Sequence, residues 1–209
     1  LTLVDIWGFT RDDILVHALP IYHVHGLFVA LHCALLAGAT TRFLPRFEPE
    51  SVLRALTGAS VFMGVPTYYT RLLALHDFPR SQISLRLWIS GSAPLLPETF
   101  TAFAQRTGDM ILERYGMTEA GMITSNPLRG PRLPGTVGAP LPGVHARVRR
   151  DDGALAASGE PGVLEIAGPN VFCGYWRNDE KTRAAFTVDG YFITGDVVTM
   201  TDAGIVAIV

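Results

Sequence analysis

The chain has 209 residues, of which 48% are hydrophobic and 17% are charged, and its formal net charge is −2. This composition excludes an intrinsically disordered chain, because it supplies enough apolar side chains to bury the core of one domain or two small ones. With 17 basic and 19 acidic residues and no cluster of Lys or Arg, it also predicts that neither nucleic acid nor an acidic membrane surface is a partner.

Short apolar runs alternate with helical patterns in the first part of the chain. Strands are predicted at Ile14–Leu19, Thr41–Leu44, Ser60–Val65, Leu85–Ser90 and Ile111–Tyr115, the last of the series. Helices are predicted at Gly26–Leu36, Glu50–Leu56, Pro66 to about Leu75, and Pro97–Thr107. Pro66 suits the first position of a helix, Gly108 is a stop signal, and the Gly26 helix is apolar enough to be buried. This alternation indicates βαβ units and a mostly parallel sheet with flanking helices.

The pattern changes near residue 135, where Gly and Pro begin to punctuate short strands. These are predicted at His145–Arg150, Gly162–Ala167, Tyr191–Thr194 and Val197–Thr201, with one short helix around Glu180–Phe186. We therefore expect an α/β fold in two parts, an α/β subdomain over residues 1–134 and a small antiparallel or barrel-like β subdomain over residues 135–209.

The two cysteines, Cys33 and Cys173, lie far apart in the chain and form no C-x-x-C motif. We expect both to be buried thiols of a reducing compartment, which predicts a cytoplasmic protein. The longest apolar run, Gly26–Gly38, contains His32 and is too short to span a bilayer.

In parallel sheets, ligands bind at the carboxyl ends of the strands, which directs attention to the loops 20–26, 64–67, 91–95 and 116–120. In the last of these, Gly116 permits a tight turn after a strand, and Thr118 and Glu119 follow side by side. Thr118 could donate to a phosphate oxygen and Glu119 could hold Mg²⁺. The alternative is a glycine turn with Thr118 as a helix N-cap and a solvated Glu119, and the spacing alone leaves both possibilities open.

The run Tyr115-Gly116-Met117-Thr118-Glu119 resembles the Y-G-x-T-E signature of the adenylate-forming superfamily, which includes acyl-CoA synthetases, luciferases and peptide-synthetase adenylation domains. Further segments resemble other parts of that superfamily in the same order. They are 19–26 (acyl-pocket loop), 64–67 (next pocket helix), 90–95 (loop along the adenine ring), 136–138 and 174–176 (structural glycines), and Thr194-Gly195-Asp196 (ribose motif). The resemblance covers essentially the whole chain.

This resemblance implies an enzyme that uses ATP, Mg²⁺ and coenzyme A to convert a carboxylic acid into an acyl-adenylate and then an acyl-CoA. Thr118 and Glu119 would be catalytic, the first gripping the phosphates and the second holding the metal. The nucleotide-binding residues would be Gly91, Ser92, Ala93, Pro94, Arg114, Tyr115, Gly116, Met117, Thr118 and Asp196. Residues 1–134 would then carry the acyl and adenine pockets, and residues 135–209 the ribose-binding Asp196.

The segments 21–30, 63–73, 112–119 and 168–172 resemble the malonyl-CoA synthetase branch most closely. Malonate and methylmalonate carry a second carboxylate, for which the planar fork of an arginine is the natural partner. Arg71 and Arg114 are the candidates. From residue type alone, Arg71 could be a solvated arginine, and Arg114 could pair with Glu113. The resemblance favours the substrate pocket for both.

His23 and His25 form an H-x-H motif, but no carboxylate or cysteine stands at ligand spacing, which disfavours a zinc site. The resemblance implies that His23 lines the acyl pocket, whereas His25 and His32 are expected to be structural or exposed. Two alternatives stay open: a ligase for a monocarboxylic fatty or aryl acid, and a non-catalytic binding module that retains the fold.

The superfamily also has a phosphate loop and a mobile C-terminal domain with a catalytic lysine, and neither is found in this sequence. The resemblance therefore implies that the 209 residues are an internal piece of the large N-terminal domain. Its partners would be the missing segments together with the acid, ATP and CoA. We expect the piece alone not to catalyse the overall reaction.

Overall fold

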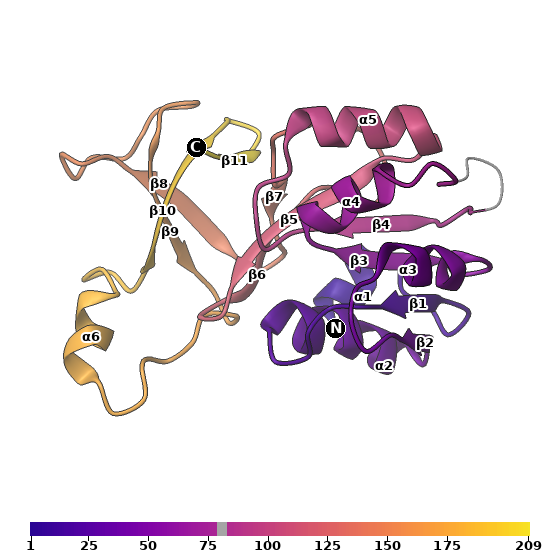
Figure 1. Cartoon of the computed structure of the whole chain (residues 1–209). Helices are drawn as coiled ribbons and strands as arrows, with labels where there is room; N and C mark the ends of the chain where they lie inside the picture. The colour runs from indigo at the N-terminus through magenta and orange to yellow at the C-terminus, as the bar shows by residue number, and fades with distance from the viewer. Residues whose placement is uncertain (79–82) are drawn as a thin grey trace.

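The computed structural model describes residues 1–78 and 83–209, which form two sheets lying side by side (Figure 1). The seven-stranded sheet has the order β2-β1-β3-β4-β5-β6-β7 and the four-stranded sheet the order β11-β10-β9-β8. The parallel strands are β1 (Ile14–His17), β2 (Thr40–Phe43), β3 (Val61–Gly64), β4 (Leu87–Ser90) and β5 (Ile111–Met117). The antiparallel strands β6 (Gly121–Ser125) and β7 (Ala139–Pro140) complete the larger sheet. The predicted α/β class with a mostly parallel sheet is confirmed.

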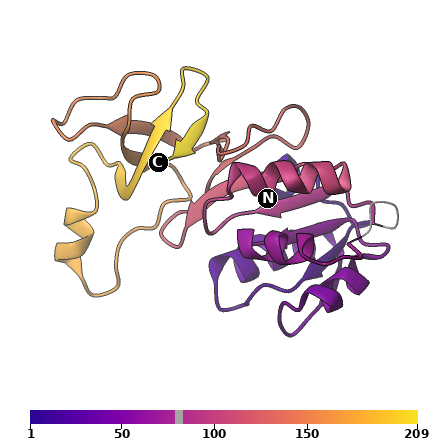
Figure 2. The same cartoon turned by 45° about the horizontal axis from the view of Figure 1, so that its top comes forward.

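Helices cover both faces of the larger sheet (Figures 1 and 2). One face packs against α3 (Pro49–Leu56), α4 (Pro66–Leu73) and α5 (Pro97–Thr107), and the other against α1 (Thr2–Ile6), η1 (His25–Leu31) and α2 (His32–Ala37). Successive strand residues enter opposite cores, as Phe62 and Met63 of β3 do, because side chains alternate along a strand. A sheet covered on both faces explains the continuous apolar runs of its strands.

Local signals set the ends of these helices. Proline occupies the first position of α3, α4 and α5, where its missing N–H costs nothing. Gly38 and Gly108 end α2 and α5 in the left-handed conformation, with φ of 71° and 82°. The roles predicted for Pro66 and Gly108 are therefore confirmed.

Three expectations about this part of the chain need correction. The predicted Gly26 helix begins at His25 as a π-helix and continues as α2, and it is not wholly buried, since Phe28, Leu35 and Leu36 are exposed. Apolar composition alone does not reveal a helix that packs on a sheet along one side only. The series of strands does not end at Tyr115, because β5 runs to Met117 and turns directly into β6. Cys33 is buried as expected, but Cys173 is exposed.

The smaller sheet is a curled antiparallel unit of β8 (His145–Arg149), β9 (Gly162–Ala167), β10 (Phe192–Met200) and β11 (Val206–Ile208). The predicted strands 191–194 and 197–201 are a single strand, β10, with a register shift between Ile193 and Val197. Its short helix α6 (Asp179–Ala184) is capped by the Asn178 side chain, which accepts a hydrogen bond from the Lys181 N–H. The antiparallel part of the prediction is confirmed.

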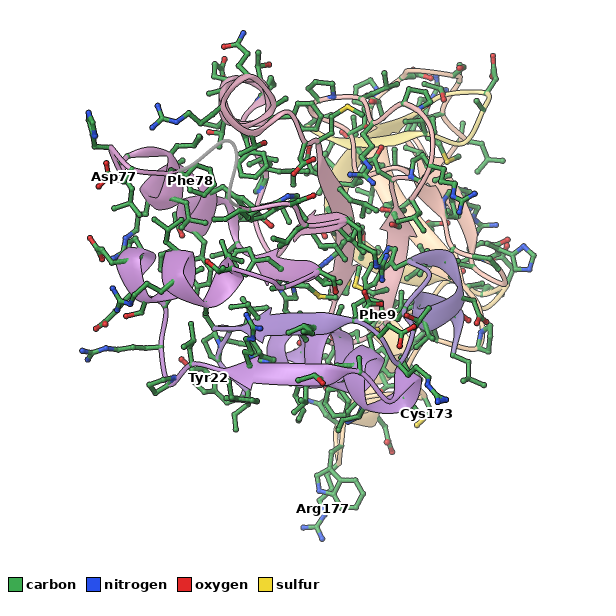
Figure 3. All side chains as sticks on the ribbon, turned by 90° about the vertical axis from the view of Figure 1, so that its right-hand side faces the viewer. Phe9, Tyr22, Asp77, Phe78, Cys173 and Arg177 are labelled. Atoms are coloured by element: carbon green, nitrogen blue, oxygen red, sulfur yellow. The ribbon has the colours of Figure 1, made fainter. Side chains whose placement is uncertain are left out.

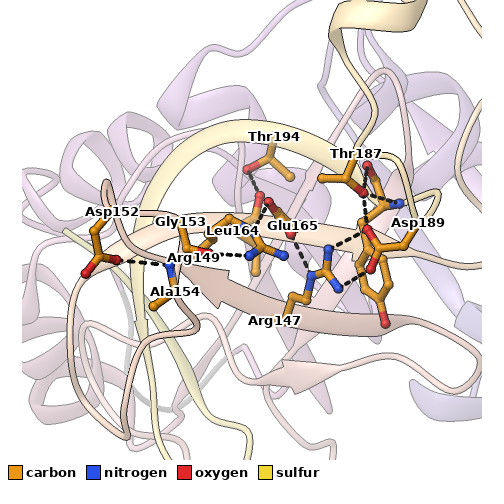
Figure 4. Close-up of polar contacts among 11 residues, drawn as sticks. Arg147, Arg149, Asp152, Gly153, Ala154, Leu164, Glu165, Thr187, Asp189 and Thr194 are labelled. Carbon is orange, nitrogen blue, oxygen red and sulfur yellow. Dashed lines mark hydrogen bonds and ion pairs between the residues drawn. The ribbon is translucent and has the colours of Figure 1, made fainter.

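An ion-pair network braces this sheet (Figure 4). The buried carboxylate of Glu165 on β9 accepts hydrogen bonds from Nε of Arg147 at 2.6 Å and Nε of Arg149 at 2.7 Å, both on β8. Arg147 also pairs with Asp189. A carboxylate with two arginine partners is tolerated in the interior because its charge is fully compensated.

The two sheets share a core, in which Tyr115 and Ile123 of the larger sheet pack with Leu164, Phe192 and Val206 of the smaller one. The boundary expected between residues 134 and 135 stays a prediction. The strand β7 at Ala139–Pro140 follows that boundary but pairs with the larger sheet. None of the helices within residues 1–78 and 83–209 is long and apolar enough to cross a membrane.

Candidate active site

The loops at the carboxyl ends of the parallel strands enclose a cavity of about 480 Å³, which we call the first cavity. Its wall combines apolar side chains with a few polar ones: Leu19, Pro20, His23, Val24, His25, Gly26, Val29, Val65, Tyr68, Ser92, Arg114, Gly116, Met117, Thr118, Gly121 and Met122. Each of the four predicted loops contributes to it. The four loops therefore lie together at one edge of the sheet.

A second cavity of about 290 Å³ lies next to the first. It is lined by Gly91, Ser92, Ala93, Pro94, Glu113, Arg114, Tyr115, Gly116, Val137, Asp196 and Ile208. Ser92, Arg114 and Gly116 line both cavities, so the two spaces meet at these residues. Of the predicted nucleotide-binding residues, only Met117 and Thr118 line the first cavity alone.

Arg114 is the central residue of this arrangement. It is 4% exposed, and its Nε and Nη2 atoms have no hydrogen-bond partner within the described residues. Burial lowers the pKa of Arg114 to about 10, which leaves the guanidinium charged at neutral pH. Glu113 does not satisfy these atoms, since its own Oε1 also lacks a partner within the described residues. A buried cation without a counter-charge is costly, and an anionic ligand in the cavity would offset that cost.

Gly91 makes room for the Arg114 side chain. A Cβ atom at position 91 would lie 2.5 Å from both Cζ and Nη1 of Arg114. The guanidinium therefore packs directly on the backbone of the 91–95 loop, and only glycine allows this approach. This contact explains why the 91–95 loop and Arg114 line a common space.

His25 and Ser92 complete the polar wall of the first cavity. Nδ1 of His25 lies 3.2 Å from Oγ of Ser92, and Ser92 has a φ of 69°, a left-handed conformation that is uncommon outside glycine. Burial, and then the charge of Arg114, lower the pKa of His25 well below its usual value, so the ring is neutral. Its Nε2 atom has no partner in the described part of the chain. Sequence reasoning missed this residue, which was expected to be structural or exposed.

His23 lies in the same loop and also lines the first cavity, although its side chain is exposed. The tight conformation of this loop requires glycine at position 26, because a Cβ atom there would lie 2.1 Å from the carbonyl oxygen of Pro20. The ring of His17 reinforces it, with Nε2 at 2.9 Å from the carbonyl oxygen of Gly26.

Glu113 was not predicted to belong to the site, yet it lines the second cavity. It is 5% exposed, and Oε1 has no partner among the described residues. Burial raises the pKa of Glu113 to about 7, even though the N–H groups of Gly135 and Leu95 stabilise its charged form. The sequence did contain a signal for its burial. Glu113 stands in a predicted strand in which every other residue except Arg114 is apolar or aromatic.

Thr118 and Glu119 lie in the turn that joins β5 to β6. Because a strand follows this turn, the alternative of Thr118 as a helix N-cap is wrong. Gly116 allows the two strands to approach closely, since a Cβ atom there would lie 2.1 Å from the carbonyl oxygen of Gly121. Thr118 is exposed on the first cavity, and Glu119 is half-buried and accepts a hydrogen bond from the hydroxyl of Tyr175 at 3.2 Å.

The oxygen atoms of Thr118 and Glu119 are compatible with a magnesium ion that is coordinated mainly by the phosphates of a nucleotide. Mg²⁺ is usually bound through one or two carboxylates together with substrate phosphates and water. Glu119 would supply one carboxylate, and the described residues contain no group of three or more His, Cys, Asp or Glu side chains that could bind a metal by themselves. The site would therefore take the metal together with a nucleotide.

Asp196 on β10 faces the second cavity from the smaller sheet. Its carboxylate accepts a hydrogen bond from the Tyr115 hydroxyl, and its N–H donates to Oγ1 of Thr194 at 3.1 Å. Burial, and then the bond to Asp196, raise the pKa of Tyr115. A hydrogen bond thus joins Asp196 to Tyr115, the first residue of the Y-G-x-T-E run, although the two are 81 residues apart in sequence.

Arg71 is not brought together with these residues. It is exposed on α4, its guanidinium lies 5.0 Å from the centre of the Phe47 ring, and it lines neither cavity. A role for Arg71 in substrate binding stays a prediction that its position does not favour.

Comparison with known proteins places this arrangement in a family. The mitochondrial malonate–CoA ligase of Xenopus laevis is 39% identical over 237 residues, which cover 96% of this chain and 41% of the relative. The structure of ATP-bound MatB from Rhodopseudomonas palustris is 52% identical with a TM-score of 0.97, over 99% of this chain and 42% of that one. A malonyl-CoA ligase in a ternary product complex with methylmalonyl-CoA and AMP is 41% identical with a TM-score of 0.91, over 100% of this chain and 46% of that one.

The chain therefore spans about two fifths of the length of the curated relative. Residues 1–176 match the family described as AMP-binding enzyme. The match includes both proposed arginines, the hairpin turn and nearly all of both cavities. On this evidence of sequence and fold, the chain belongs to the AMP-binding enzyme family.

Proposed function

We propose that the whole protein is an ATP-dependent acid–thiol ligase that forms an acyl-adenylate and then an acyl-CoA from malonate or methylmalonate. The observation that carries this proposal is the unpaired polar wall of the first cavity. Nε and Nη2 of Arg114 and Nε2 of His25 are buried and lack partners in the described residues. A substrate with a second carboxylate would satisfy the two donors of the guanidinium, whereas a monocarboxylic acid would leave them unpaired.

The two cavities suit the two substrates of such a reaction. In the second cavity, the backbone of Gly91–Pro94 would flank the adenine and Asp196 would take the ribose hydroxyls. In the first cavity, the acid would lie between Arg114 and the apolar side chains of Val29 and Met122. The reacting carboxylate would then attack the α-phosphate beside Gly116, where the cavities join, and pyrophosphate would leave.

The chemistry requires two anions to approach each other, so the protein must hold them in line and offset their charge. Thr118 would donate to a phosphate oxygen, and Glu119 would hold Mg²⁺. The metal, when bound, neutralises negative charge on the phosphates. Charged Arg114 would pair with the distal carboxylate of the acid and offset its charge. The thiol of coenzyme A would then displace AMP from the acyl-adenylate.

The malonate ligases among the relatives support the proposed substrate. The cytoplasmic location expected from the cysteines stays a prediction, because the Xenopus laevis relative is described as mitochondrial.

The proposal is tested by incubating the whole protein that carries this chain with ATP, Mg²⁺, CoA and one acid at a time, and identifying CoA esters by mass spectrometry. We expect malonyl-CoA and AMP, with kcat/KM for malonate at least about 100-fold above that for butyrate. Similar values for the two acids would refute the dicarboxylate assignment and favour a monocarboxylic acid. No ester with any acid would refute the ligase and favour a binding module.

A further inference from the structure

The turn that carries Thr118 and Glu119 is clamped by a distant segment, residues 170–175. The Asn170 side-chain amide donates to the carbonyl oxygens of Ala120 at 2.9 Å and Met122 at 3.1 Å. The N–H of Phe172 donates to the carbonyl oxygen of Glu119 at 2.8 Å. These bonds hold the backbone of the turn in place, but they leave the Glu119 side chain free to rotate.

Tyr175 is the residue of this segment that reaches the carboxylate itself. Its hydroxyl donates to Oε1 of Glu119 at 3.2 Å. Its neighbours Cys173 and Trp176 are exposed, and the side chain of Arg177 projects away from the body of the molecule (Figure 3). Tyr175 itself is half-buried, as Phe172 of the same segment is, and its hydroxyl reaches back to the turn.

The position of Tyr175 is fixed from several sides. Its N–H donates to Oγ1 of Thr182 at 2.9 Å, and the Lys181 Nζ atom lies 4.1 Å from the centre of its ring. The ring of Phe172 meets it edge-on at 4.9 Å. Gly174 permits the contact with α6, because a Cβ atom there would lie 2.7 Å from Cγ2 of Thr182. A tyrosine held this firmly is suited to orient another side chain.

We propose that Tyr175 is a positioning residue that orients the Glu119 carboxylate for the metal, an inference that rests on the proposed function. By occupying Oε1, the hydroxyl leaves Oε2 as the oxygen presented to a cation on the nucleotide phosphates. Hydrogen bonds to ligating carboxylates fix their orientation, and removing such a bond typically weakens metal binding by about 10- to 100-fold. Lys181 supports the tyrosine ring and does not touch the reacting groups.

The test is Tyr175→Phe in the whole protein, which keeps the ring and its contacts with Lys181 and Phe172 but removes the hydroxyl. We expect the Mn²⁺ dissociation constant, measured by electron paramagnetic resonance in the presence of ATP, to rise about 10-fold. The Mg²⁺ concentration for half-maximal adenylation should rise in parallel, whereas ATP binding without metal should be unchanged. Tyr191→Phe is the matched control, because the Tyr191 ring packs on Arg147 and not on the turn. We expect it to leave both metal measurements unchanged.

Glu119→Gln, measured in parallel, separates the possible results. Weaker metal binding in both the Glu119 and the Tyr175 variants, with unchanged melting temperatures, supports the inference. Weaker binding in Glu119→Gln alone overturns the positioning role and leaves the proposed function standing. Unchanged metal binding in both variants refutes the metal role of Glu119, and the positioning role falls with it.

Discussion

Replacing Arg114 by methionine should abolish the preference for malonate without weakening the fold. The substitution removes a buried cation whose Nε and Nη2 atoms lack partners, and it keeps most of the apolar volume of the side chain. Removing one member of a buried, hydrogen-bonded charge pair costs roughly 2 to 5 kcal/mol of binding energy. A central value of about 3 kcal/mol corresponds to a loss of about 100-fold in kcat/KM for malonate. Butyrate has no second carboxylate, so its kcat/KM should change only slightly.

Stability gives an independent readout of the same substitution. Each buried hydrogen-bonding group left unpaired costs about 1 to 3 kcal/mol, so the ligand-free Arg114→Met protein should melt at the same temperature as the wild type or higher. Arg71→Met is the comparison variant, since Arg71 packs on Phe47 outside both cavities. It should keep the malonate preference. Equal losses on malonate and butyrate in Arg114→Met, or a marked fall in melting temperature, would refute the reasoning.

Two further substitutions test the walls of the second cavity. Gly91→Ala should displace the Arg114 guanidinium, because the new methyl group would lie 2.5 Å from its Cζ and Nη1 atoms. We expect kcat/KM for malonate to fall more than kcat/KM for butyrate. Unchanged selectivity would show that the 91–95 loop moves and the guanidinium stays in place. Glu113→Gln should flatten the pH dependence of stability. The pKa of Glu113 is raised by burial to about 7, so the wild-type carboxyl contributes stability that is full below its unfolded pKa and lost as the pH rises to about 7. The loss is about 3 kcal/mol over that window, and urea unfolding that is equally pH-dependent in wild type and variant would contradict this account.

Much of the fold followed from periodic patterns and turn residues. Pro66 and Gly108 mark helix ends by chemistry that acts locally, and they were placed correctly. The strand β6 was missed because its residues, Gly121–Ser125, show neither a long apolar run nor strict alternation. Its strand conformation comes from pairing with β5 across the Gly116 turn, and such pairing cannot be recognised from a short segment alone.

The site shows the same division between local and long-range causes. Thr118, Glu119 and Asp196 were predicted as site residues because they stand in motifs, and the hydrogen bond between Tyr115 and Asp196 brings those motifs together. Glu113 and His25 line the cavities but were not predicted to do so, because their burial is set by segments distant in sequence. Arg71, whose role in substrate binding stays a prediction, illustrates a different limit. Its helix was predicted correctly, but the sequence does not reveal that this side chain packs against Phe47.

We propose above all that the Arg114 guanidinium, which lines both cavities, binds the distal carboxylate of the acid. It is tested most directly by a crystal structure of the whole protein with a non-hydrolysable malonyl-adenylate analogue. We predict that the free carboxylate accepts two hydrogen bonds from Arg114, with N–O distances of about 2.7 to 2.9 Å. A free carboxylate that points to solvent, or that is bound by Arg71, would contradict the claim.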